Sequence, residues 1–292
     1  MIYLIASILC SASLFIMFKW FGQNRIDTFQ AIVINYAVAF GCGALLDPIP
    51  LGQVFGGSNP WLPWALGLGV LFIALFYLIA ITAQRISVSV ATVSTKMSIV
   101  IPIIAAVPLY GDTMPALKVV GILLALAGVV LASWTGEKLQ FSSLALILPI
   151  ILFAGNGTID LVLKYVQHEH LGEESPIQFS SMIFGTAGLI GIVVLTGRNL
   201  LQKKSIDLRS ILAGIALGLP NFGSIYFLMK ALALSGMQSS EIFPINNMGV
   251  VLLSALGAML FFGEKGSRLN RLGVALSIIA IALIAFHGSL FG

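Results

Sequence analysis

Long runs of apolar residues alternate with short polar segments along the whole chain. A helix needs about 20 apolar residues to cross the roughly 30 Å hydrocarbon layer of a bilayer, and runs of that length recur from the first residues to the last. Run length and flanking polar residues predict ten spans, at 2–21, 28–46, 61–83, 89–109, 116–134, 143–166, 177–196, 209–231, 238–262 and 270–288. These runs are too long for membrane β-strands, so the predicted fold is an all-α membrane bundle.

Composition agrees with a membrane location. Hydrophobic residues make up 59% of the chain and charged residues only 9%, far from the composition of a soluble domain. The first run has no basic segment before it and ends in Phe18-Lys19-Trp20 rather than at a small-residue cleavage site. We therefore expect it to remain as a membrane span and not to act as a removable signal peptide.

Basic residues are distributed unevenly among the loops. Of the fifteen Lys and Arg residues, eleven lie in or beside the loops that follow the odd-numbered spans: Lys19, Arg25, Arg85, Lys138, Arg198, Lys203, Lys204, Arg209, Lys265, Arg268 and Arg271. Cytoplasmic loops are enriched in Lys and Arg. The count therefore predicts that these loops are cytoplasmic and that both termini lie outside, in a protein of the cytoplasmic membrane, such as a bacterial inner membrane.

The sequence also contains an internal repeat. A shift of 152 residues lays 90–133 over 242–285 and places Gly111-Asp112 on Gly263-Glu264, while a shift of 145 places Lys19 on Lys164. Each half, 1–140 and 141–292, holds five predicted spans, so the second half must enter the membrane with opposite polarity. Inverted repeats of this kind are typical of alternating-access transporters; a channel is the alternative.

With two five-span halves, each carrying a short Gly-acidic turn before its last span, the chain resembles the drug/metabolite transporter superfamily in its ten-span EamA type. The resemblance covers essentially the whole chain. It implies a secondary transporter whose substrate cavity is lined mainly by spans 3, 4, 8 and 9, with contributions from 1 and 6. Members carry amino acids, nucleotide-sugars, sugar phosphates or drugs, so the resemblance selects no substrate. It implies cytoplasmic termini, which disagrees with the charge count.

Lys96 is the leading candidate for substrate contact. It lies near the middle of the fourth predicted span, where Ser89, Thr92 and Lys96 share one helix face. A buried charge in a membrane span is costly and usually faces a cavity or a partner. We expect Lys96 to bind a carboxylate or phosphate of the substrate; the alternatives are an ion pair with Asp160 or Glu241, or snorkelling to the interface.

In the sixth span, Asn156 and Asp160 lie four residues apart, so both can face the same cavity. One hypothesis is that Asp160 couples transport to protons by taking up and releasing one. The alternatives are an ion pair with Lys96 or Lys164, or a shallow solvated position.

The remaining candidates contribute amides and aromatic rings. Asn246 and Asn247 lie in the ninth span near Pro244 and are expected to line the cavity or to hydrogen-bond between helices. Glu241 is expected to act as a coupling or ion-pair group, or only to mark the membrane interface. Asn221 and Tyr226 in the eighth span are expected to make polar contacts beside a kink, and Tyr77 to form an aromatic wall.

The sequence contains no HExxH metal motif and no GxxxxGK[ST] phosphate loop, and His168-Glu169-His170 reads as a solvated loop rather than a metal site. We expect no enzyme activity and no cofactor. The predicted function is secondary active transport of a small polar metabolite, coupled to a proton or ion or by exchange. Alternatives are a lipid flippase or drug exporter of the same fold, a channel, or a membrane scaffold. Expected partners are substrate, lipid and a coupling ion but no nucleic acid, in a monomer or homodimer.

Overall fold

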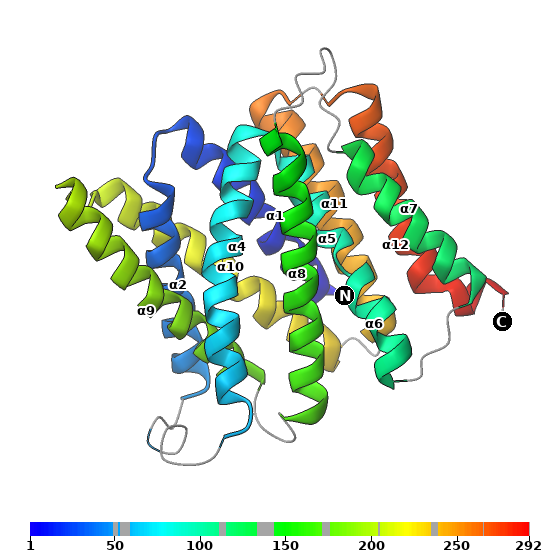
Figure 1. Ribbon diagram of the computed structural model, residues 1–292, viewed down its shortest axis with the longest axis horizontal. Helices are drawn as coiled ribbons and strands as arrows, with labels where there is room; N and C mark the ends of the chain where they lie inside the picture. Colours follow the sequence, from blue (N-terminus) through cyan, green and yellow to red (C-terminus); the bar gives the residue numbers. More distant parts are fainter. Residues whose placement is uncertain are drawn as a thin grey trace.

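The computed structural model is an all-α bundle (Figure 1). It describes residues 1–48, 52, 59–110, 115–132, 143–170, 176–203, 205–234, 239–264 and 266–291. The helices are α1 (Ile2–Gln23), α2 (Thr28–Leu46), α4 (Leu62–Arg85), α5 (Val88–Met97), α6 (Val100–Tyr110), α7 (Ala116–Ala132), α8 (Ser143–Glu169), α9 (Pro176–Gln202), α10 (Leu208–Leu234), α11 (Ser239–Phe262) and α12 (Arg268–Phe291). Every predicted span contains a helix, so the predicted fold class is confirmed.

The bundle is apolar on its outside as well as in its core. Leu189, Val193 and Leu260 are among many large apolar side chains that are exposed, as expected for helices surrounded by lipid. Eight helical segments of the described chain are long and apolar enough to cross a membrane, with α5 and α6 together forming one of them. The protein is therefore an integral membrane protein.

Helices at equivalent positions in the two halves lie against each other: α2 against α9, α5 against α11 and α7 against α12. The α7–α12 contact is very close. A side chain at Gly273 would collide with the backbone of Ala132, and the Asn270 amide donates to the Ala132 carbonyl. This arrangement is what two copies related by a two-fold axis would produce, although the division at residue 140 remains a prediction.

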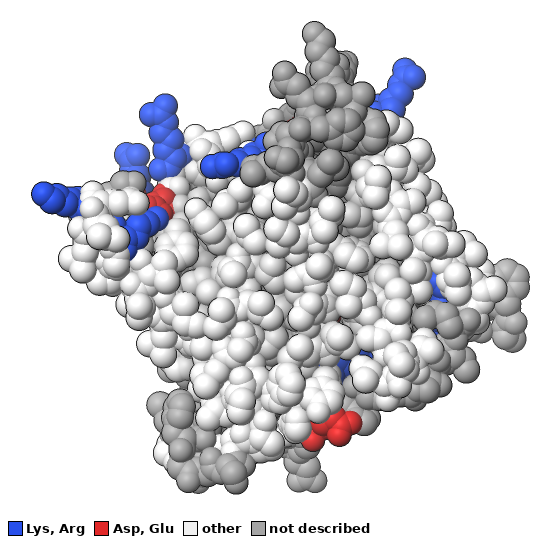
Figure 2. All heavy atoms as spheres, viewed as in Figure 1, with Lys and Arg blue, Asp and Glu red and all other residues white. Residues whose placement is uncertain are grey.

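The turns after α1, α4, α9 and α11 lie at one end of the bundle, which we call the basic end. In Figure 2, most visible Lys and Arg side chains project from this upper edge. Whether this end faces the cytoplasm remains a prediction. Several residues counted for it, including Lys138 and Lys265, lie outside the described residues.

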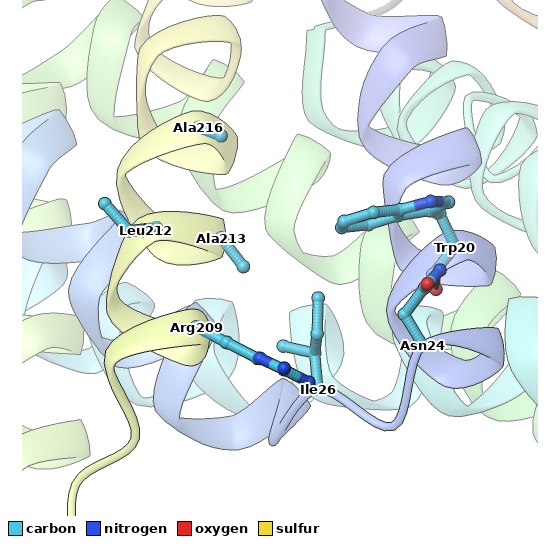
Figure 3. A pocket seen from close by; sticks show the side chains of 7 residues that line it. All are labelled: Trp20, Asn24, Ile26, Arg209, Leu212, Ala213 and Ala216. Carbon is cyan, nitrogen blue, oxygen red and sulfur yellow. Dashed lines mark hydrogen bonds between the residues drawn. The ribbon is translucent and has the colours of Figure 1, made fainter.

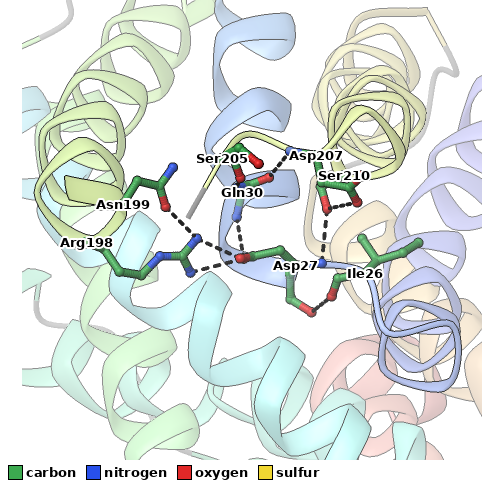
Figure 4. Close-up of polar contacts among 9 residues, drawn as sticks. Ile26, Asp27, Gln30, Arg198, Asn199, Ser205, Asp207 and Ser210 are labelled. Atoms are coloured by element: carbon green, nitrogen blue, oxygen red, sulfur yellow. Dashed lines mark hydrogen bonds and ion pairs between the residues drawn. The ribbon is translucent and has the colours of Figure 1, made fainter. Parts of the chain in front are cut away.

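A polar cluster ties α2, α9 and α10 together at the basic end (Figure 4). Asp27 caps α2 by accepting from the Gln30 amide, and its carboxylate pairs with Arg198 at 2.7 Å. The Asp27 amide donates to Ser210, whose hydroxyl donates to Asp207. Because Asp27 bonds to both Arg198 of α9 and Ser210 of α10, this cluster links the ends of the three helices.

Candidate functional site

The fourth predicted span is not one continuous helix: it breaks at Ser98 and Ile99, between α5 and α6. Pro102 has no amide hydrogen to donate to the Ser98 carbonyl four residues earlier. The Ile101 amide donates to that carbonyl instead, at 2.9 Å, in a tighter turn. The hydroxyls of Thr95 and Ser98 also donate to carbonyls of their own helix, which competes with regular helix geometry.

Lys96 and Asp160 lie near this break, on different helices. Lys96 is half-buried in the last turn of α5, where a cation interacts favourably with the helix dipole. The Ser98 hydroxyl, which donates to the Thr95 carbonyl, also lies 3.3 Å from a carboxylate oxygen of Asp160 on α8. The charges of Lys96 and Asp160 interact, but among the described residues the Lys96 ammonium makes no ion pair or hydrogen bond. Asp160 is therefore the acidic group nearest in effect to Lys96 among the described residues.

Asp160 is exposed although it lies well inside the 27-residue helix α8, next to the buried Ile159. Carboxylates within membrane spans face a water-filled opening or a partner rather than lipid, because solvation by hydrocarbon is costly. Among the described residues, the Ser98 hydroxyl and the charge of Lys96 are the groups that interact with the Asp160 carboxylate.

Two further polar groups point to an interior binding surface. Ser94 on α5 and Asn246 on α11 are at most 4% exposed, and the Ser94 hydroxyl and the Asn246 carbonyl oxygen have no hydrogen-bond partner among the described residues. The repeat shift of 152 residues places Ser94 on Asn246, and α5 packs against α11. Buried polar atoms without partners are rare, so a ligand or water that satisfies both groups is a good explanation for them.

The other polar candidates of the first predicted half, and Asn156 of α8, bond within their own helices or pack on neighbouring rings. Thr92 is fully buried and donates to the Val88 carbonyl, and the Asn156 amide donates to the Leu152 carbonyl. Tyr77 packs edge-to-face against Phe29, with ring centroids 5.5 Å apart.

In the second half, Asn221 is buried with an unpartnered amide nitrogen. Tyr226 stacks on Phe222 and lies under the Lys230 ammonium, and Asn247 is half-buried. The side chain of Glu241 lies outside the described residues.

The helix face beyond the break is apolar. Ile101, Ile104, Ala105, Val107 and Pro108 of α6 line a hollow of about 580 Å³. Ile101 also packs against α8, where any side chain at Gly157 would collide with it. The polar groups at the break therefore adjoin an apolar surface, a combination typical of small-molecule sites.

An ion pair joins the two predicted halves at the basic end. The Lys19 ammonium on α1 lies 3.0 Å from the Glu264 carboxylate in the turn between α11 and α12, and both side chains are only 16% exposed. Glu264 also accepts from the Val88 amide at the start of α5. Gln84 of α4 joins this contact by donating to the Phe18 carbonyl and to Thr28.

Sequence reasoning missed the pairing of Lys19 with Glu264 and the unpartnered groups of Ser94 and Asn246. The repeat places Lys19 on Lys164 and Glu264 on Asp112. It does not predict that Lys19 and Glu264 meet, because a contact between distant spans carries no local signal. The position of the break had a signal in the sequence: a serine four residues before Pro102, in a segment rich in Ser and Thr.

Residues 1–134 match the model of the EamA-like transporter family. The EamA-like family, part of the drug/metabolite transporter superfamily, is a family of membrane transporters. The match spans the first predicted repeat and confirms the resemblance seen in the sequence.

Two further comparisons extend over nearly the whole chain. An uncharacterized protein from Haemophilus influenzae (strain ATCC 51907 / DSM 11121 / KW20 / Rd) is 28% identical over 284 residues, which is 95% of each chain. A protein of known crystal structure aligns over 100% of this chain and 98% of its own, with a TM-score of 0.65 and 15% sequence identity. At that identity, the structural likeness supports the fold alone.

Proposed function

We propose that this protein is a secondary active transporter that carries a small polar metabolite with an anionic group by alternating access. The observation that supports this proposal best is the Lys96 ammonium beside the helix break, which interacts with the charge of Asp160 but makes no ion pair or hydrogen bond with any described residue. Broken helices near the bilayer midplane expose backbone groups and helix ends that bind polar ligands in many transporters.

An asymmetry in packing supports alternating access. The repeat makes α1 equivalent to α8, α4 to α10, and α5 with α6 to α11. In this structure α1 packs against α4 and α5, whereas α8 has no comparable packing against α10 or α11 within the described residues. α8 instead packs against α4, α5 and α6 of the other predicted half. A difference of this kind between equivalent helices is expected when one side of an inverted repeat is closed and the other is open.

Asp160 is the candidate coupling group. An exposed carboxylate that interacts with Lys96 can hold a proton or lose it when substrate arrives. Under this proposal, a substrate anion on Lys96 would compete with Asp160 for the same cation, which links the occupancy of the two sites.

The test is thermal unfolding of the purified protein in detergent with panels of anionic, zwitterionic and cationic metabolites. Wild type is compared with Lys96→Met and with Lys118→Met, a matched control in which the lost lysine lies at the start of α7. A ligand at a hundred times its dissociation constant should add about 2.7 kcal/mol of stability. We expect anionic compounds to stabilise wild type and Lys118→Met but not Lys96→Met. Stabilisation of all three proteins by the same anion would show that Lys96 is structural.

A further inference from the structure

A cavity of about 420 Å³ lies at the basic end between α1 and α10 (Figure 3). Trp20 and Asn24 from the end of α1 form one wall, and Arg209, Leu212 and Ala216 from the start of α10 form the other. The cavity exists because α1 ends beside it and because Ala216 leaves space that a larger side chain would fill.

At one end of this cavity lies the Arg209 guanidinium group, which has no partner among the described residues. The Arg209 side chain is exposed, and no described residue accepts a hydrogen bond from its guanidinium group. Asp207, the nearest acid in sequence, accepts instead from the Arg209 amide and the Ser210 hydroxyl. A free guanidinium group binds the oxygens of a phosphate group in a bidentate geometry.

Below this cation the cavity opens onto the lipid-facing side of α10. Leu212 is 59% exposed, and Leu208 and Leu219 on the same helix are similarly exposed. Trp20 in the opposite wall is 46% exposed, and tryptophan is enriched at the level of lipid headgroups. A cationic head above an apolar wall that is continuous with the lipid-facing surface fits a molecule with a phosphate and an acyl chain, and a free phosphate would leave the apolar part unfilled.

We propose that this cavity binds an anionic phospholipid of the adjacent leaflet, with the lipid phosphate on Arg209 and an acyl chain along Leu212 and Ala216. The site is separate from the transport site near Lys96 and does not depend on the proposed function. Basic pockets between membrane helices bind anionic lipid headgroups by the same chemistry.

The test uses delipidated full-length protein in a neutral detergent. Thermal unfolding is followed during titration with phosphatidylglycerol, with phosphatidylcholine of the same acyl chains, and with inorganic phosphate. Three variants are compared with wild type: Arg209→Gln removes the cation, Ala216→Phe fills the acyl groove, and Arg271→Gln is a matched control, an exposed arginine near the start of α12 at the same end. Each variant is referred to its own lipid-free melting temperature.

We expect phosphatidylglycerol to stabilise wild type and Arg271→Gln saturably and more than phosphatidylcholine does. Arg209→Gln should bind it about fivefold more weakly, which is about 1 kcal/mol, and Ala216→Phe should lose the effect. Equal stabilisation by both lipids, equal losses in Arg209→Gln and Arg271→Gln, or full stabilisation by inorganic phosphate would each overturn the proposal.

Discussion

The ion pair between Lys19 and Glu264 leads to the sharpest prediction. It joins α1 of the first half to the α11–α12 turn of the second, and Glu264 also caps α5. If the halves alternate, this contact must break when the basic end opens. Glu264→Gln removes the charge but leaves an amide oxygen that can still accept from the Val88 amide, so the substitution isolates the ion pair from the cap.

The size of the effect follows from the geometry. Coulomb's law with an effective dielectric constant of about 20 gives about 5 kcal/mol for unit charges 3.0 Å apart, before desolvation. Desolvation offsets much of this attraction: exposed pairs contribute at most about 1 kcal/mol, whereas breaking a buried pair costs about 3–5 kcal/mol. With both side chains 16% exposed, we expect about 2 kcal/mol. That energy shifts the equilibrium toward the open state about thirtyfold.

The assay measures opening directly. Ser89 is buried in α5 and follows Val88, whose amide donates to Glu264. Replacing it by cysteine, Ser89→Cys, is nearly isosteric. In a background with Cys10→Ser and Cys42→Ser, a membrane-impermeant maleimide applied from the basic end should label this cysteine about thirtyfold faster when Glu264→Gln is added.

A matched control separates gating from loss of stability. Arg198→Gln breaks the other ion pair of the basic end, which joins α2 to α9 and has side chains 24% and 25% exposed. It should lower the melting temperature without speeding the labelling of Ser89→Cys. Unchanged labelling in Glu264→Gln, or equal acceleration in Arg198→Gln, would refute the idea that Lys19 and Glu264 hold the basic end closed.

Three further predictions test the site, the packing and the topology. Asn246→Ala should cost little stability, because the buried side-chain oxygen of Asn246 has no partner among the described residues. It should nevertheless weaken the stabilisation by any metabolite that is found to stabilise wild type but not Lys96→Met. A large drop in melting temperature without ligand would contradict this. Gly273→Val should destabilise the protein by about 1–3 kcal/mol in denaturant unfolding, because the new side chain meets the Ala132 backbone, whereas Gly67→Ala, with open space around it, should not. The charge distribution predicts that a cysteine added before Met1 reacts with impermeant reagent on intact cells; protection there would favour the family topology.

The sequence predicted the fold well because run length is set by the thickness of the bilayer. The fourth span was predicted as one continuous run, although Pro102 and the Ser and Thr residues before it favour a break, because the competition between side-chain and backbone hydrogen bonds depends on local geometry. The sequence also does not show which face of an apolar helix points to the core, because lipid and core are equally apolar. Tyr77 illustrates this: its ring packs against Phe29, a contact that the sequence does not show, and its role as a cavity wall stays a prediction.

The candidate site was predicted in part for a related reason. Charges are conspicuous in an apolar chain, so Lys96 and Asp160 could be identified individually, and the structure brings them within electrostatic reach. Ser94 could not be identified in this way, because serine is common in membrane helices and becomes notable only when burial leaves its hydroxyl without a partner.

The repeat extends the gating argument to the opposite end of the molecule. It places Lys19 on Lys164 and Glu264 on Asp112; Asp112 lies outside the described residues, so this second pairing is a prediction from sequence alone. If the halves exchange conformations, Lys164→Gln should weaken closure of the opposite end and leave the basic end shut, so Ser89→Cys should label more slowly than in the unmodified background. Faster labelling from the basic end would show that the two lysines act together, and not in alternation.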